Sequence, residues 1–95
     1  QVTHTAPAFN ISKNIIFNNS KGIESYSDSN LIFNNNLIDN SINVYDEGTN
    51  WWDNGYPSGG NYFDDYVGID ANHDGFGDAP YDISGGSNQD LYPLM

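Results

Sequence analysis

The sequence predicts an all-β fold: a short solenoid of about two coils, closed by an irregular, aromatic-rich C-terminal segment that binds calcium. Three observations predict it: short apolar runs flanked by Asn before residue 46, clustered aromatics and glycines after it, and an acidic loop at Asp70–Asp78. A chain of 95 residues builds a thin core and buries only about 60–65% of its unfolded surface. Because cysteine is absent, we expect a metal or an oligomeric contact to stabilise it.

The first half consists of β-branched or aromatic runs of three to five residues, with Asn or Gly at most of their ends. Such runs are too short for helices and are typical of strands joined by tight corners. Asn suits these corners because it tolerates left-handed backbone angles, and stacked Asn side chains hydrogen-bond between turns. The expected strands lie within residues 14–19, 22–26, 30–35, 36–40 and 41–45.

Two of these runs repeat. Residues 14–19 match residues 30–35 at an offset of 16, and residues 22–26 match residues 41–45 at an offset of 19. Periods near 20 residues are typical of solenoids, in which each repeat buries its strands against the next turn. An ordinary antiparallel sheet or sandwich with Asn-rich turns is the competing interpretation, which the short repeat disfavours.

The chain divides into three segments within one domain. Residues 1–9 form a Pro-interrupted leader, either a linker or a strand donated to a neighbour. Residues 10–46 hold the coils, and residues 47–95 form the calcium-binding cover of the last coil. Eight of the fourteen aromatics lie between residues 51 and 81. We expect them to cap the coils, whereas the alternative is an exposed sugar-stacking platform; the residues concerned are Trp51, Trp52, Tyr56 and Tyr62.

The charge is strongly acidic, with thirteen Asp and Glu against two Lys. Ten of these carboxylates lie in residues 46–95, which contain no Lys or Arg, so this half is expected to attract divalent cations. A nucleic-acid partner is excluded by the lack of a basic patch, and a membrane span by the lack of an apolar run of about 20 residues. Two sequons, at Asn10 and Asn18, are compatible with a glycosylated surface protein.

The loop Asp70–Asp78 follows the calcium loop of EF-hands. Side chains ligate from positions 1, 3 and 5 of such loops, Gly at position 6 makes the turn, and position 7 offers its carbonyl. Position 12 is Tyr81 in place of the usual Glu, so another carboxylate has to complete the site, and no amphipathic helix flanks the loop. The expected calcium ligands are Asp70, Asn72, Asp74, Phe76 and Asp78, completed by Asp64, Asp65 or Asp82.

Four stretches of the second half are similar to the closing segment of secreted right-handed parallel β-helix proteins that are abundant in archaea, among them NosD-type repeat proteins. They are residues 52–55, 60–66, 70–81 and 90–94, and the Asn-flanked strands of residues 10–45 resemble the coils of this group. The resemblance implies a right-handed, pectin-lyase-like parallel β-helix, an extracellular or cell-surface setting, and calcium in the closing segment. Members of the group have many more coils than the two expected here. Copper is not carried over, because its preferred His, Cys and Met ligands are reduced to His4, His73 and Met95.

These features predict a non-enzymatic, calcium-stabilised extracellular structural module. It is expected to stack end to end into a homo-oligomer, such as a filament or surface layer, or to form part of a larger cell-surface β-helix. The alternative is an adhesion module that binds polysaccharide through exposed aromatics. Lyase chemistry is disfavoured because the only basic residues, Lys13 and Lys21, are far in sequence from the acidic segment.

Overall fold

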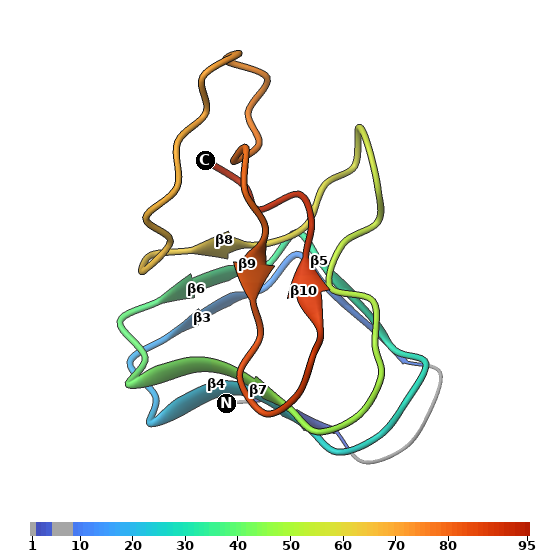
Figure 1. Ribbon diagram of the computed structural model, residues 1–95. Helices are drawn as coiled ribbons and strands as arrows, with labels where there is room; N and C mark the ends of the chain where they lie inside the picture. Colours follow the sequence, from blue (N-terminus) through green and yellow to red (C-terminus); the bar gives the residue numbers. More distant parts are fainter. Residues whose placement is uncertain (1, 5–8) are drawn as a thin grey trace.

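A computed structural model describes the backbone of residues 2–4 and the whole of residues 9–95. The all-β class is confirmed, because these described residues form ten short strands and no helix, hence none long and apolar enough to cross a membrane. Three sheets are purely parallel, with the orders β1-β4-β7, β2-β5 and β3-β6-β8, and β9 pairs antiparallel with β10 (Figure 1). The strands are β1 (Val2–His4), β2 (Asn10–Ser12), β3 (Ile15–Phe17), β4 (Lys21–Ser25), β5 (Leu31–Phe33), β6 (Asn36–Ile38), β7 (Ile42–Asp46), β8 (Tyr62–Phe63), β9 (Tyr81–Asp82) and β10 (Gln89–Asp90).

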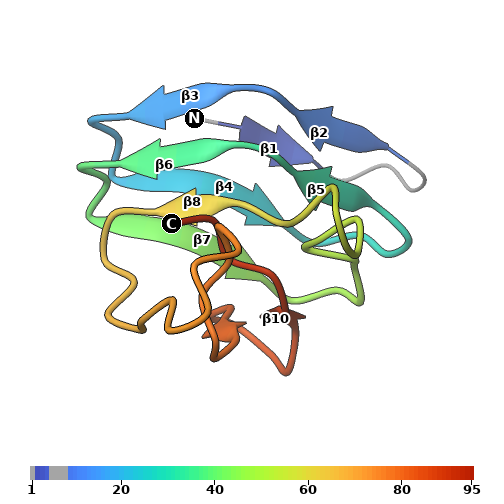
Figure 2. The same cartoon turned by 90° about the horizontal axis from the view of Figure 1, so that it is seen from above.

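Consecutive strands belong to different sheets, so the chain visits the three parallel sheets in turn. Strands β2, β3 and β4 form a first passage and β5, β6 and β7 a second one, which lies beside the first in the same direction (Figure 2). Partners across the two passages are 21 residues apart: Asn10 with Leu31, Ile15 with Asn36, and Lys21 with Ile42.

The predicted offsets of 16 and 19 residues are therefore wrong, although the five expected strands are present. The run at residues 14–19 pairs with β6 and not with the similar run at residues 30–35. The error has a simple cause: Asn flanks the strands at every corner, so local sequence similarity does not tell one corner from another.

Parallel pairing continues beyond residue 46, where the cover was expected to begin. Trp51 bridges to Leu31, β8 pairs with β6, and Ser84 bridges to Tyr45, so the second half adds a third, interrupted layer to all three sheets. Between these contacts the chain leaves the layer in loops, and the β9–β10 pair lies across the strands in Figure 1. The leader predicted for residues 1–9 lies mainly outside the described residues, apart from β1, which pairs with β4, and Phe9.

The core is a set of aliphatic side chains that lie above one another in successive layers. Ile23 and Val44 are partners in one sheet, and their side chains are almost completely buried. Each such side chain contributes about 1.5–3 kcal/mol when it is removed from water. The other buried apolar residues are Ile11, Ile16, Ile32, Leu37, Trp52, Phe63 and Ile83.

Corners between strands share one local design: a residue in the left-handed region, then an Asn. Lys13 and Asn34 occupy equivalent corners with φ of 60° and 57°, and Asn18 and Asp39 a second pair with 60° and 55°. Left-handed backbone turns the chain sharply, and Asn is among the few side chains that tolerate it. The Asn that follows each turn points its amide along the stack toward the next layer.

These amides form three columns of hydrogen bonds. In the first column, the backbone N–H and Nδ2 of Asn14 both donate to Oδ1 of Asn35 (3.1 and 2.9 Å), and Asn35 donates to Asn61 in the same way (3.1 and 2.9 Å). The predicted stacking of Asn side chains is thus confirmed. The second column contains Asn30 and Asn50, and the third contains Asn19, Asn40 and Asn43.

Candidate functional site

The acidic loop at residues 70–78 is closed by hydrogen bonds to its own backbone. The carboxylate of Asp70 accepts from the N–H groups of Asp74 (3.1 Å) and Gly75 (2.9 Å), while Asp74 accepts from Phe76 N–H (2.9 Å) and Asp78 from Ala71 N–H (3.0 Å). Partial desolvation raises the pKa of Asp70, but the two N–H donors outweigh it, so this pKa is lowered. The Asn72 amide donates to Asp74 (3.2 Å). The loop carboxylates thus bond within the loop.

The carboxylates expected to complete the loop bond elsewhere. Asp64 accepts from the Asn43 amide (2.9 Å) and from Asp39 N–H (2.7 Å), which lowers its pKa. Asp65 accepts from the Tyr81 hydroxyl (2.9 Å) and from Asn43 (3.0 Å).

Burial, followed by the Asp65 hydrogen bond, raises the pKa of Tyr81. Asp82, the third expected carboxylate, accepts from the side-chain amide of Gln89 (2.8 Å). All three carboxylates thus hold the tail to the layers and to itself.

Two buried carboxylates that the sequence reasoning missed lie at the ends of Asn columns. Asp90 is fully buried and accepts from Asn61 N–H (2.7 Å), Asn61 Nδ2 (3.2 Å) and Tyr92 N–H (3.0 Å). Desolvation by burial raises the pKa of Asp90 to about 7, against the opposing effect of these donors. Asp46, also fully buried, accepts from the Asn50 amide (2.8 Å) and Trp52 Nε1 (2.8 Å). The only signal for either residue was its proximity to an aromatic run.

The four aromatics assigned to stacking or capping separate into two environments. Trp52 is completely buried in the core, whereas its neighbour Trp51 keeps 62% of its surface exposed. Tyr56 and Tyr62 are also exposed, and Tyr56 packs edge-on against Phe76. Trp52 is therefore a core residue, and Trp51 is the one beside a surface hollow of about 530 Å³.

Both sequon residues are solvent-exposed. Asn10 begins β2, and Asn18 lies in the left-handed corner after β3. Their glycosylation stays a prediction.

Residues 6–68 match the family model described as periplasmic copper-binding protein (NosD). The chain belongs to this family, since the match spans more than half of it. The predicted NosD-type resemblance is thereby confirmed at the level of the family. No curated protein and no solved structure matches the chain.

The prediction of bound calcium is wrong. Among residues 9–95, no group of three or more His, Cys, Asp or Glu side chains is placed to hold a metal ion. The NosD family is described by copper and not calcium, and the match ends before the loop begins. The physical reason lies in the alternating Asp and Asn residues, which suit either an oxygen cage or turns that accept backbone N–H groups. Without an acidic twelfth position, their oxygens bond the loop's own amides.

Proposed function

We propose that this chain is a non-enzymatic structural module that forms the closed carboxyl end of a right-handed parallel β-helix. The three parallel sheets would be its three sides, and each passage one coil. Crossovers between parallel strands are right-handed in about 98% of cases, which supports the handedness. The observation that carries the proposal is that the Asn columns run in one direction and meet carboxylates at the end of the stack.

An Asn side chain both donates and accepts, so a column of Asn residues has no natural end. A carboxylate only accepts, so it satisfies the last donors and offers none to a further layer. The first column follows this rule at Asp90, which accepts both donors of Asn61. The third column ends at Asp64 and Asp65, which both accept from Asn43, and the Asn50 amide meets Asp46.

Aromatic packing supports the same interpretation. The Tyr81 ring stacks on Phe63 with centroids 3.7 Å apart and planes 3° apart, so the last layer is covered from the side away from β6. Trp52 fills the core beneath the tail and donates to Asp46. A cover of this kind protects the end of a stack from further pairing.

The opposite edge is formed by β2 and β3, which pair on one side only among the described strands. We assign this edge to another layer of β-helix. Self-association fits the same edge: because the carboxyl end is covered, copies would pair edge to edge across a two-fold axis. A two-fold contact closes as a dimer, unlike a head-to-tail filament.

An envelope or extracellular setting is part of the proposal, because the family is described as periplasmic. Copper is not part of it. Cysteine is absent, His73 lies alone on an exposed loop, and Met95 is the only Met. The side chain of His4 lies outside the described residues. These residues do not fit a copper centre, which requires several soft or imidazole ligands together.

Adding one passage at each end tests the proposal. A second copy of residues 9–29 inserted before Phe9 should raise the thermal midpoint, because it extends the columns and buries the β2–β3 edge. The same segment appended after Met95 is the matched control and should add no stability. Equal effects of both insertions, or disorder of the first one by hydrogen exchange, would refute the proposal. Sedimentation of the unmodified chain as a monomer at all concentrations would remove the dimer from it.

A further inference from the structure

The outer face of the β2-β5 sheet carries a hollow with one aromatic wall. Its volume of about 530 Å³ falls within the roughly 300–1,000 Å³ typical of small-molecule sites. The lining combines one exposed indole with amide, hydroxyl and carboxylate groups from three separate parts of the chain. The main lining residues are Asn10, Ser29, Leu31, Trp51, Asp53 and Asn54.

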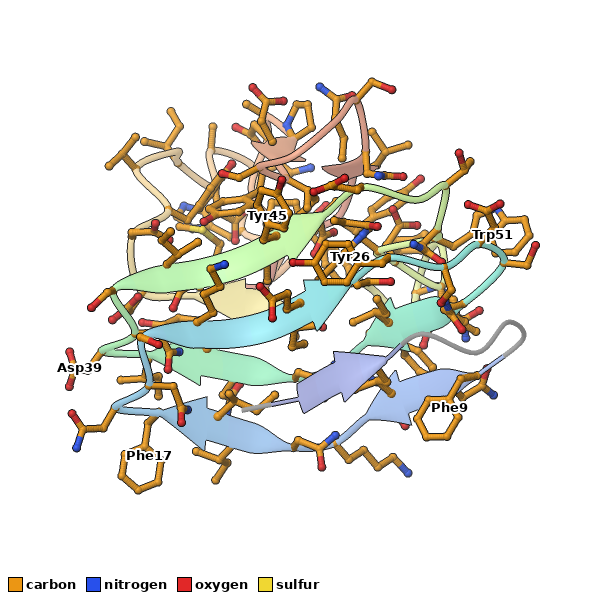
Figure 3. The ribbon with its side chains drawn as sticks, turned by 90° about the horizontal axis from the view of Figure 1, so that it is seen from below. Phe9, Phe17, Tyr26, Asp39, Tyr45 and Trp51 are labelled. Atoms are coloured by element: carbon orange, nitrogen blue, oxygen red, sulfur yellow. The ribbon has the colours of Figure 1, made fainter. Side chains whose placement is uncertain are left out.

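Trp51 is held rigidly although its side chain is exposed. Its N–H donates to the carbonyl of Asn30 (2.9 Å), and its carbonyl accepts from Ile32 N–H (2.8 Å). The backbone is thus fixed in the third layer, while the ring projects outward at the edge of the molecule (Figure 3). A fixed, solvent-exposed indole offers a flat apolar surface at little cost in conformational entropy.

The polar groups around Trp51 have capacity for a ligand. The exposed side chains of Asn10 and Ser29 form no hydrogen bond with any described residue. Asp53 is oriented by the N–H groups of Gly55 and Leu91 (both 3.0 Å), and its carboxylate retains further lone pairs. A ligand with many hydroxyl groups satisfies all three side chains, whereas an apolar one would leave them unpaired.

We propose that this hollow binds a neutral polysaccharide, with one sugar ring stacked on Trp51 and neighbouring hydroxyls bonded to Asn10, Ser29 and Asp53. The C–H groups of a pyranose ring pack on the indole face, and the hydroxyls at its rim reach the polar wall. The residues Asn10, Leu31 and Trp51 lie in register on adjacent strands, a path of about 10 Å at 4.7–4.9 Å per strand.

Charge selects a neutral chain over an acidic one. The protein has a formal net charge of −11, and the hollow contains Asp53 and no Lys. A polyuronate would therefore be repelled, most strongly at low ionic strength. The same field opposes a nucleic acid, whose bases also stack on aromatic rings.

Titration with three probes tests the site: a soluble neutral β-glucan oligosaccharide, a soluble mannan oligosaccharide and polygalacturonate. We expect at least one neutral probe to bind, to shift the tryptophan emission and to reduce its quenching by iodide, since Trp51 is the exposed indole. Trp51→Ala should raise the Kd of that probe at least tenfold, while Trp51→Phe should recover part of the affinity. Tyr56→Ala is the matched control, because Tyr56 is as exposed as Trp51 but lies outside the hollow.

Three outcomes would overturn the proposal: no binding of either neutral probe, unchanged binding by Trp51→Ala, or tighter binding of polygalacturonate. Folding of each variant is checked by the blue-shifted emission of buried Trp52. If Trp51→Ala fails to fold, the double variant Asn10→Ala/Ser29→Ala tests the polar wall, and unchanged affinity refutes the site. Binding is measured independently of the stability readout that tests the structural module, so each proposal can fail alone.

Discussion

The two halves of the molecule stack layers with different chemical groups. Residues 9–46 use Asn amides, which pass a hydrogen bond from each layer to the next, as Asn14 does to Asn35. Residues 47–95 contribute the carboxylates that receive the last bonds, such as Asp90 beneath Asn61. Propagation requires a side chain that donates and accepts, whereas an end requires one that only accepts. Asn and Asp, nearly equal in shape, therefore have opposite roles in this fold.

The apolar residues differ between the halves in the same way. Within the passages, an aliphatic residue lies on an aliphatic partner, as Ile11 on Ile32, because the spacing of adjacent strands leaves little room. At the covered end the partners are large and flat, and Tyr81 lies on Phe63. Repeated layers thus need matching volumes, and the cover needs area.

The largest expected effect comes from placing a carboxylate inside a column. Asn61→Asp removes the amide that donates to the carbonyls of Ile32 (3.1 Å) and Trp52 (2.9 Å) and to Asp90. It also places two buried carboxylates side by side, so we expect a loss of about 3–5 kcal/mol in unfolding free energy, measured by urea denaturation.

Asp64→Asn, at the solvent-exposed end of the third column, is the control and should cost less than about 1 kcal/mol. Equal losses in the two variants would contradict the distinction between the inside and the end of a column.

The next largest effect is a dependence of stability on pH through Asp90. Its pKa is raised to about 7 in the folded chain, so between about pH 4 and pH 7 the folded state holds a proton that the unfolded state has released. The unfolding free energy should therefore fall as the pH rises through this window, by at most about 4 kcal/mol at 1.36 kcal/mol per unit.

Denaturation across that window compares the natural chain with Asp90→Asn, which cannot titrate at this position. The variant should show a flatter profile. Parallel profiles would assign the pH dependence to the overall negative charge instead.

A smaller effect is expected at the corners. Lys13 adopts φ of 60°, as does the equivalent Asn34 at 57°, and Asn tolerates this region better than Lys. Lys13→Asn should raise the unfolding free energy by about 0.5 kcal/mol, read from the thermal midpoint. The reciprocal change Asn34→Lys should lower it by a similar amount, and opposite signs would show that side-chain contacts, not the backbone, decide these positions.

No effect is expected from calcium. Since the carboxylates of the loop at residues 70–78 bond their own backbone amides, neither excess calcium chloride nor EDTA should change the thermal midpoint. Calorimetric scans of the same sample in both conditions measure this directly. A saturable rise of the midpoint with calcium would reinstate a cation at the loop.

Much of the first half was predictable because its signals are local. Asn at strand ends marks a corner, and alternating burial in runs such as Ile15–Phe17 marks a strand. The 21-residue register was not predictable by matching runs, because similar runs follow different corners. Trp51 and Trp52 show a second limit: they are adjacent and chemically identical, yet one is exposed and the other buried, since an extended chain directs neighbours to opposite sides.

The sequence alone determined the all-β class, the Asn corners, the acidic second half and the NosD-type resemblance, because each follows from residue type and short-range pattern. Only the tertiary structure decided which carboxylates matter and what they bind. Asp90 and Asp46 are buried at the ends of Asn columns, whereas the acidic loop, the strongest motif in the sequence, bonds to itself. The reason is physical: a carboxylate oxygen accepts equally from a metal, an amide or water, and only the surrounding fold determines which of these lies within reach.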